Sequence, residues 1–465
     1  MSYTLGHFLR DVEQGITANQ LSKVLSINPE INGLIPKLQP QIQGMSSELM
    51  MKKIEEQHYF NGDWPSFETM LQSYLLFVRD FNPWSILESI DLMIKFYESL
   101  SVSLNNLQFN SKLLLLQYES TNLIVPLARL VDMKMMKINN RVNDYPRLSH
   151  VSTILLKALN NLRSDPDLNL PSNRNKISVI MHTSITLCRT YIAIDSTMLC
   201  NNVFSNINIL SLDKSLISKK QLIQYRIQLG KFHLLQSNYL LAYNHFNWCY
   251  LNCYFQTPRK IILAILKYLV PCGLLVGKIP NTEYLESKLG SQDSFITMYK
   301  SLIQHYKAGD IYNFSMLVSH YETYFLELGF LIGFLQRMRL ILLRNLLLNV
   351  YKNTRSKNLL FSDVKIGLQL SLQPESSYQN FDSVNKWFYP LISNHNEQQQ
   401  LQQNSFIISD AFVENVLASL IDGNLMKAKL TTGRTIILSK TGSFPKVYDI
   451  YKIIYPATTK EKWLY

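Results

Sequence analysis

Glycine and proline are scarce in this sequence, which contains only sixteen of each in 465 residues. Turn-rich all-β proteins and low-complexity disordered chains use both residues far more often, so these two classes are disfavoured. Apolar residues make up 47% of the chain and charged residues only 17%. A chain of this length folds as several units rather than around one core. We therefore expect a mainly α-helical protein of several units, part of whose surface is covered by partner proteins.

Cysteine is rare too, and its distribution excludes a disulfide framework. The five thiols are an odd number without a C-x-x-C pair, at Cys188, Cys200, Cys249, Cys253 and Cys272. Because they lie in apolar segments, we expect buried, reduced cysteines. The first residues, Met-Ser-Tyr-Thr-Leu-Gly-His-Phe, contain no basic stretch followed by an apolar one, so no secretory signal is predicted. A protein of the cytosol or nucleus is expected.

Long apolar runs are absent as well. Residues 261–276 are interrupted by Lys267 and Pro271, and the uncharged run at residues 328–335 is short. A membrane span needs about 20 consecutive apolar residues. We expect both segments to form core helices, without insertion into a membrane.

The sequence also lacks the common catalytic and cofactor motifs. It contains no G-x-S-x-G, no H-E-x-x-H and no glycine-rich dinucleotide turn. Residues 273–279 resemble a phosphate-binding loop, but one residue is missing between the glycines and Ile279 replaces the metal-binding hydroxyl. His245, Cys249 and Cys253 share a helical face, yet residues eight apart are separated by about 12 Å along a helix, too far for one zinc ion. We predict no enzyme, no cofactor and no metal site.

The spacing of apolar residues predicts stacked helices in the first part of the chain. Leu71, Tyr74, Leu75 and Val78, for example, recur at intervals of three and four. This spacing places them on one face of a helix, which we expect to be buried against neighbouring helices.

Residues 225–246 carry the clearest repeat pattern. Gly230 is followed twelve residues later by Ala242 and then by Phe246, the spacing of a tetratricopeptide-like (TPR-like) helical hairpin. Gly230 and Ala242 lack bulk, so two helices can cross closely there. The alternative is an ordinary helical hairpin, because two positions where an aromatic pair is usual are occupied by Arg226 and His233.

A different pattern occupies the last quarter of the chain. Residues 361–372 are expected to form a helix with Ser362 as its N-cap. A glutamine-rich tract at residues 397–404 is expected to be a solvated loop. A second helix is expected at residues 410–422, because its apolar residues form one stripe. The expected boundaries of that helix are Ser409 as N-cap and Gly423 after the last turn.

A β-hairpin is predicted to follow these helices. Residues 426–430 alternate with period two, residues 431–433 allow a turn, and residues 434–438 form a returning strand. Helices followed by a β-hairpin are the order of a winged helix. A closing helix is expected at residues 445–454.

The net charge of +12 is concentrated in two windows without acidic residues. The first window lies between Glu327 and Asp363, and the second between Asp422 and Asp449. A basic surface suits an acidic partner such as nucleic acid. The cations of the first window are Arg337, Arg339, Arg344, Lys352, Arg355 and Lys357. Those of the second are Lys427, Lys429, Arg434, Lys440 and Lys446.

The predicted hairpin is the candidate nucleic-acid-binding element. Lys427 and Lys429 alternate with apolar residues and thus share one side of their strand, which suits contacts with phosphates. We predict that phosphates are bound by Lys427, Lys429, Arg434 and Lys440, with the track extended by Arg355 and Lys357. The outward face of the 410–422 helix offers no Lys or Arg but only Glu414, Asn415 and Ser419. Base-specific reading is therefore not expected, and RNA or DNA would be bound without strong sequence preference.

Two alternatives remain open from the residues alone. The cations are also compatible with an ordinary solvated surface or with a surface that faces an acidic protein. Arg344 in particular also suits a buried structural role.

Several segments together resemble a known family, over a stretch from about residue 60 to residue 465. They are Tyr74-Leu-Leu-Phe-Val-Arg-Asp-Phe-Asn-Pro-Trp-Ser85, the 225–246 hairpin, Tyr268-Leu-Val-Pro271, Leu274-Leu-Val-Gly-Lys-Ile279 and residues 344–346. In this order they are similar to the Thp-type PCI subunits of the nuclear transcription-and-export complex 2. The resemblance implies a PCI domain, that is, TPR-like helical repeats that end in a winged helix.

The resemblance also implies a function. It implies a non-catalytic subunit that pairs with a larger scaffold PCI protein of the Sac/GANP family and with a small acidic protein of the Sem/DSS type. The paired winged helices would present a basic platform to RNA or DNA and couple transcription to mRNA export. It further implies a nuclear location, at nuclear pores and transcribed chromatin. The alternative is a purely structural PCI subunit of a proteasome-lid-like or signalosome-like assembly.

The sequence predicts four segments. They are an N-terminal helical region at residues 1–200, TPR-like repeats at 201–343, a winged helix at 344–440 with a glutamine-rich insertion near 373–404, and a C-terminal helix and tail at 441–465.

Overall fold

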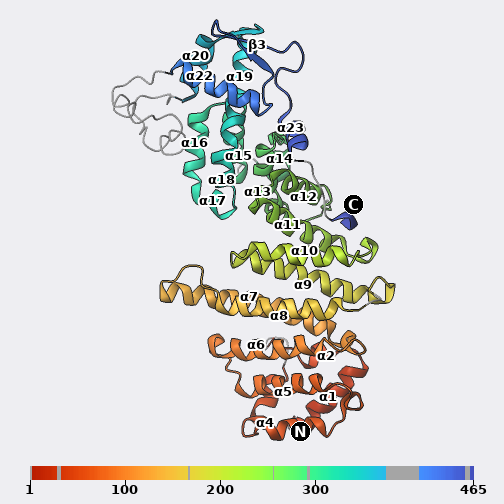
Figure 1. Ribbon diagram of the computed structural model, residues 1–465. Coiled ribbons are helices and arrows are strands. Elements are labelled where there is room, and N and C mark those ends of the chain that lie inside the picture. The colour runs from red at the N-terminus through yellow and green to blue at the C-terminus, as the bar shows by residue number, and fades with distance from the viewer. Residues whose placement is uncertain are drawn as a thin grey trace. The chain divides into compact units, whose positions relative to one another are not determined.

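The computed structural model describes most of the chain (Figure 1). The described residues are 3–28, 33–165, 168–254, 256–290, 294–372, 408–455 and 461–464. The chain divides into two compact units, of which the first contains residues 1–228 and 459–465 and the second residues 229–458. The predicted glutamine-rich insertion lies outside the described residues. Among the residues that are described, no helix is long and apolar enough to cross a bilayer.

The first unit consists of helices. They are α1 (Leu5–Thr17), α2 (Leu21–Val24), α3 (Ile35–Ile42), α4 (Ser47–Glu55), α5 (Pro65–Asp80), α6 (Ile86–Ser103), α7 (Leu114–Asn139), α8 (Pro146–Arg163), α9 (Arg174–Ala193), α10 (Cys200–Ile209) and the first part of α11 (Lys219–Leu235). Short 3-10 helices are η1 (Tyr59–Gly62), η2 (Asn110–Leu113), η3 (Pro171–Asn173), η4 (Thr197–Leu199), η5 (Lys214–Leu216) and η7 (Lys462–Leu464).

Consecutive helices of the first unit pack against one another in layers (Figure 1). The predicted apolar face of α5 is buried, as shown by Leu71, Tyr74, Leu75 and Val78, which are at most 1% exposed. Ser85 caps α6 by accepting a hydrogen bond from the backbone N–H of Glu88. The predicted stacking of helices is confirmed.

Residues 461–464 pack on the α10–α11 part of the first unit. The Arg226 guanidinium is 1% exposed and donates a hydrogen bond of 2.7 Å to the carbonyl of Leu464. The indole N–H of Trp463 donates to Asn208 Oδ1 at 2.7 Å. The Tyr225 ring lies 5.5 Å from the Trp463 ring. Arg226 departs from the repeat pattern because it binds this returning segment.

The second unit consists of helices and a small sheet. Its helices are the rest of α11, α12 (Tyr239–Leu251), α13 (Arg259–Leu275), α14 (Thr282–Leu289), α15 (Ser294–Ala308), α16 (Ile311–His320), α17 (Glu322–Glu327), α18 (Leu331–Gln336), α19 (Met338–Thr354), α20 (Phe361–Leu372), α22 (Asp410–Asp422) and α23 (Val447–Ile454). Its strands are β1 (Asn358–Leu360), β2 (Ala428–Leu430) and β3 (Thr435–Leu438).

The predicted helical hairpin is formed by α11 and α12. Asn238 lies in the turn and caps α12 by accepting a hydrogen bond from the backbone N–H of Leu241. Gly230 faces the Phe246 ring, so the close approach depends on this pair. Residues 261–276 lie almost entirely in α13, which is buried from Leu269 to Leu275, as expected for a core helix.

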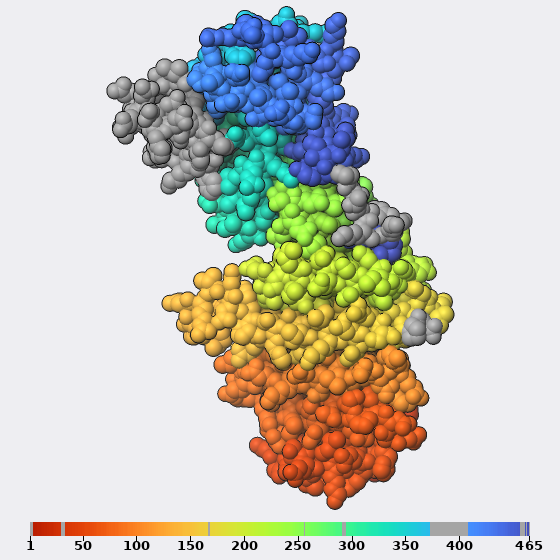
Figure 2. Space-filling model, viewed as in Figure 1, coloured from red at the N-terminus to blue at the C-terminus, as the bar shows by residue number. Residues whose placement is uncertain are grey.

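The winged helix follows α19 (Figure 2, cyan and blue). Its sheet has the order β1-β3-β2, and both pairs of neighbouring strands are antiparallel. The helices at residues 361–372 and 410–422 have the predicted bounds, and Ser409 accepts a hydrogen bond from the backbone N–H of Phe412. The predicted fold, a mainly α chain of stacked helices that ends in a winged helix, is confirmed.

Three details of the winged helix differ from the sequence prediction. Residues 358–360 form a strand that sequence patterns did not indicate, because three residues are too few to show alternation. Ser362 is the second residue of α20, since β1 runs directly into that helix. Gly423 has a φ of −74°, and the left-handed residue after α22 is Asn424, with a φ of 54°. Asparagine tolerates this conformation better than most residues.

The cysteines agree with the expectation of unpaired thiols. Cys188, Cys200, Cys249 and Cys272 are buried, Cys253 is half-buried, and all five are free. Burial raises the pKa of the Cys188 and Cys272 thiols well above its usual value, which disfavours the reactive thiolate.

Candidate nucleic-acid interface

The predicted phosphate-binding residues are all exposed. They lie at strand ends or in the segments that join the strands to neighbouring helices. Arg355 and Lys357 lie between α19 and β1, Lys427 and Lys429 precede and occupy β2, and Arg434 and Lys440 flank β3.

The predicted alternation along the 426–430 strand is confirmed. Met426 is 1% exposed, and Ala428 and Leu430 are half-buried. Lys427 and Lys429 point to the opposite side and are exposed. This pattern arises because successive side chains of a strand point to opposite faces of the sheet.

The sheet brings cations from three separate segments to one of its ends. The carbonyl of Lys357 accepts a hydrogen bond of 2.9 Å from the backbone N–H of Leu438. The carbonyl of Lys427 accepts one of 2.9 Å from the backbone N–H of Ser439. Because Leu438, Ser439 and Lys440 are consecutive, the backbones of Lys357, Lys427 and Lys440 lie close together at this end of the sheet. We call these three residues the wing cluster.

Two further cations lie beside the wing cluster. Lys429 is two residues along β2 from Lys427, and its register partner on β3 is Ile437. The same Ile437 pairs with Asn358 of β1, so the exposed face of the sheet continues across all three strands. Arg355 precedes Lys357 by two residues and has a left-handed backbone, with a φ of 51°.

Arg434 lies apart from the wing cluster, at the opposite end of β3. Its guanidinium forms an ion pair of 2.7 Å with Asp410, the first residue of α22. Asp410 also forms an ion pair of 2.5 Å with Lys365. The hydrogen bond from Lys365 and the charge of Arg434 lower the pKa of Asp410 below its usual value. A phosphate that binds Arg434 must therefore compete with this carboxylate.

The first basic window contributes less to the surface than its charge suggests. Arg344 is only 9% exposed and donates hydrogen bonds of 3.2 and 2.7 Å to the carbonyls of Phe444 and Pro445. It therefore has the structural role that the sequence left open. Burial lowers the pKa of Arg344 and of Arg339.

The outward face of α22 has the predicted composition. Glu414, Asn415 and Ser419 are exposed, whereas Val413, Val416 and Leu417 are buried. No cation of α22 faces solvent, because the helix contains neither Lys nor Arg. The commonest specific base contact comes from Arg or Lys, and this face offers neither.

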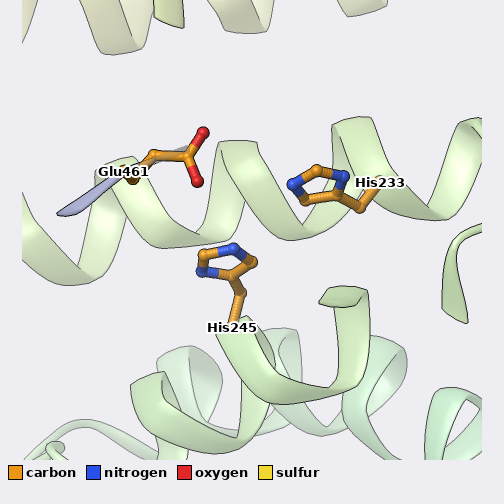
Figure 3. A group of neighbouring side chains, drawn as sticks. All are labelled: His233, His245 and Glu461. Atoms are coloured by element: carbon orange, nitrogen blue, oxygen red, sulfur yellow. The ribbon is translucent and has the colours of Figure 1, made fainter. Parts of the chain in front are cut away.

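Two histidines stack between α11 and α12 (Figure 3). The rings of His233 and His245 are nearly parallel, with centroids 5.5 Å apart and an interplanar angle of 5°. His245 is fully buried. Glu461, the third residue labelled in Figure 3, belongs to the first unit. The sequence analysis named both histidines but gave no signal that their rings stack.

Stacked helices that lead into a three-stranded winged helix agree with the architecture that the resemblance implies. No model of a known protein family matches the sequence. The chain is similar to Nuclear mRNA export protein THP1 of Saccharomyces cerevisiae, with 27% identity over 428 residues, or 87% of each chain.

Two further relatives carry the PCI domain in their names. A PCI domain-containing protein of Schizosaccharomyces pombe is 28% identical over 44% of this chain and 45% of its own length. A PCI domain-containing protein 2 homolog of Dictyostelium discoideum is 23% identical over 63% of this chain and 59% of its own length. These similarities confirm the predicted resemblance to Thp-type PCI proteins.

Proposed function

We propose that this protein is a non-catalytic PCI subunit of a nuclear mRNA export complex and that its winged helix binds nucleic acid. The observation that carries the export role is the similarity to an mRNA export protein over 87% of both chains. The observation that supports binding is the wing cluster, in which the exposed residues Lys357, Lys427 and Lys440 come from three segments whose backbones meet at one end of the sheet.

The proposed binding mode is electrostatic and tolerant of sequence. Lys and Arg side chains contact phosphates, which repeat identically along every nucleic acid. The wing cluster, with Lys429 and Arg355 beside it, matches such a repeating partner. Because α22 presents no cation to a groove, the same surface accepts RNA or DNA without strong base preference.

The proposal includes protein partners. A scaffold PCI protein of the Sac/GANP family would pair with this chain, and a small acidic protein of the Sem/DSS type would bind it. The complex would act in the nucleus, at nuclear pores and transcribed chromatin, and would couple transcription to mRNA export. Purification from cells with an affinity tag tests this part, since the partners can be identified by mass.

The test of nucleic-acid binding is charge reversal at the wing. We expect a variant with Lys427, Lys429, Arg434 and Lys440 changed to Glu to bind unrelated RNA and DNA sequences more weakly to a similar degree. The slope of log K against log salt should fall by about 0.7 to 0.9 for each phosphate that the variant no longer binds. The measurement is a salt-titrated binding assay of the chain with its scaffold.

A matched control is available in the first unit. Lys52, Lys95, Lys134 and Lys137 are exposed, and their reversal to Glu changes the net charge by the same amount without touching the wing. If the wing variant kept both affinity and salt slope, the wing would not be the binding surface. Co-purification of proteasome-lid-like or signalosome-like subunits would instead support the purely structural alternative.

A further inference from the structure

Two lysines converge on one tyrosine of α23. The Nζ atom of Lys278 lies 4.2 Å from the centroid of the Tyr448 ring, and that of Lys452 lies 4.8 Å from it. Both lysines are exposed. Lys278 follows α13 and Lys452 belongs to α23, so packing of two separate segments creates the pair.

Contacts with α12 hold Tyr448 in place. Its hydroxyl donates a hydrogen bond of 3.3 Å to Asn244 Oδ1 of α12. Its ring meets the Tyr243 ring edge to face, with centroids 6.1 Å apart and an interplanar angle of 71°. The backbone packs closely as well, because a Cβ atom on Gly277 would lie 2.5 Å from the Cβ of Val447. The two ammonium groups are therefore placed in advance of any ligand.

No carboxylate of the described residues neutralises the ammonium groups of Lys278 and Lys452. Each ammonium group contacts the ring through a cation–π interaction, which is weak at an exposed site. Among the described residues, neither Lys278 nor Lys452 has a carboxylate within 4.0 Å. The acidic residue of α23 is Asp449, which forms no such ion pair with them. Both ammonium groups are therefore available to an anion.

The pair is continuous with the wing. The backbone N–H of Lys427 donates a hydrogen bond of 2.8 Å to the carbonyl of Ser443. Lys446 lies three residues further and is exposed. The next residue, Val447, packs on Gly277, which precedes Lys278. Figure 2 shows the dark blue surface of α23 between the wing and the green surface of the preceding helices.

We propose that Lys278, Lys446 and Lys452 form a second phosphate-binding site, which continues the path of a nucleic-acid strand from the wing onto α23. This inference rests on the proposed function of the wing. It adds residues that the sequence analysis did not assign, since Lys278 lies far from both basic windows in the sequence. Tyr448 is a positioning residue, because it holds the two ammonium groups without itself reaching a phosphate.

Nucleic acid is the favoured occupant because its phosphates are evenly spaced along a strand. A polyanion that lies on the wing cluster meets Lys446 and then the Lys278–Lys452 pair along one run of contacting residues. An acidic peptide is the other occupant that the charge permits, and the experiment distinguishes the two.

The experiment measures binding of the full chain to a 30-nucleotide oligouridylate and to a 30-residue oligoglutamate across a salt series. We expect the change of Lys278, Lys446 and Lys452 to Glu to raise the Kd for the RNA roughly tenfold and to lower the salt slope by about 0.7 for each phosphate that is no longer bound. Reversal of Lys95, Lys134 and Lys137 to Glu is the charge-matched control and should have a much smaller effect.

A second variant tests whether the position of the Lys278 and Lys452 ammonium groups matters apart from their charge. Tyr448→Leu keeps every cation but removes the ring that places them, so RNA binding should weaken without a change in net charge. Tyr448→Phe keeps the ring and should bind RNA nearly as the unchanged protein does. Thermal unfolding of each variant shows whether α23 is still folded.

The outcomes distinguish the inference from the proposed function. If the wing variant loses affinity while the α23 variant keeps both Kd and salt slope, the inference is overturned and the proposed function stands. If the α23 variant loses affinity for oligoglutamate but not for RNA, the site binds an acidic peptide and the inference is wrong. If the unchanged protein binds no RNA, both fail.

Discussion

Gly230 of α11 and Phe246 of α12 lie so close that a Cβ atom on the glycine would come within 2.7 Å of the ring. Real Cβ atoms do not approach a ring this closely, so the hairpin depends on a glycine at this position. Sequence reasoning identified Gly230 as a point of close approach but paired it with Ala242. The structure shows that the ring of Phe246 takes up the space.

Substitution of this glycine should destabilise the second unit. Gly230→Val forces the Phe246 ring out of its position, and overpacking of this kind costs about 1–3 kcal/mol. For a unit of this size we expect the midpoint of thermal unfolding to fall by about 2–4 °C per kcal/mol. Gly6→Val is the control, because a Cβ atom at this helical glycine meets only Thr4 Oγ1 at 3.9 Å. Equal midpoints for the two variants would contradict this account.

Arg344 should control the order of the segment that joins β3 to α23. Its guanidinium donates to the carbonyls of Phe444 and Pro445, and hydrogen bonds from a charged group contribute about 1.5–3 kcal/mol. We expect Arg344→Met to speed amide hydrogen exchange in this segment and to lower the free energy of unfolding by about 2 kcal/mol. Arg355→Met is the control, because that side chain is exposed. Unchanged exchange in the Arg344 variant would show that other contacts hold the segment.

Asp410 should act as an internal competitor for phosphate. Its carboxylate pairs with both Lys365 and Arg434. Asp410→Asn removes the negative charge, so we expect tighter RNA binding and a salt slope that rises by about 0.7 to 0.9 for each cation that gains a phosphate. Asp422→Asn, at the other end of α22, is the matched control. A parallel gain in both variants would mean that only net charge matters.

The stabilisation that the Asp410 ion pairs provide should be lost only in acid. Because the folded-state pKa of Asp410 is lowered, the stabilisation from its ion pairs is present above the usual carboxyl range and is lost as the pH falls through the lowered value. Nuclear magnetic resonance titration of the Asp410 side chain measures this pKa. In the Arg434→Gln variant we expect the pKa to rise, and an unchanged value would leave Lys365 as the sole cause.

His182 should make the first unit sensitive to mild acid. Burial, together with the charges of Arg189 and Lys220, lowers its pKa to about 4. An unfolded histidine has a pKa of about 6.5. Between pH 4 and pH 6.5 the unfolded chain therefore binds a proton at His182 that the folded chain does not bind. Stability is therefore full above pH 6.5 and decreases as the pH falls toward 4.

The measurement is urea unfolding at several pH values. Between pH 7 and pH 5 we expect the unchanged protein to lose about 1–2 kcal/mol more than His182→Gln, since one pKa unit corresponds to about 1.4 kcal/mol. His150→Gln, which changes an exposed histidine, should behave as the unchanged protein does. A His182→Gln variant with the same pH dependence would show that another group causes the loss.

Much of the fold could be predicted from local sequence. The apolar spacing of α5 and the alternation of Lys427 and Lys429 with buried residues are set by helix and strand geometry, which repeats over a few residues. The cap at Ser409 is equally local, because the side chain bonds to a backbone N–H three residues on. The winged helix was recognisable because its elements follow one another along the chain.

What could not be predicted depends on residues far apart in sequence. Arg226 and Leu464 are separated by 238 positions, and no local pattern indicates their hydrogen bond. Lys278 and Lys452 contact the same Tyr448 ring only because α23 packs beside the end of α13. The ion pair of Arg434 with Asp410 joins two segments that are separated by 24 positions, and no local pattern indicates it. Charge counts along a sequence do not show which cations are already neutralised.

The segment at residues 461–464 has a consequence for the order of synthesis. These residues belong to the first unit, yet a ribosome produces them only after all of the second. Proteins generally fold from the N-terminus as they emerge from the ribosome. The guanidinium of Arg226 therefore has no acceptor until Leu464 is synthesised, more than two hundred residues later. A released chain that ended before this segment would contain the whole winged helix but would leave the Arg226 guanidinium without its acceptor.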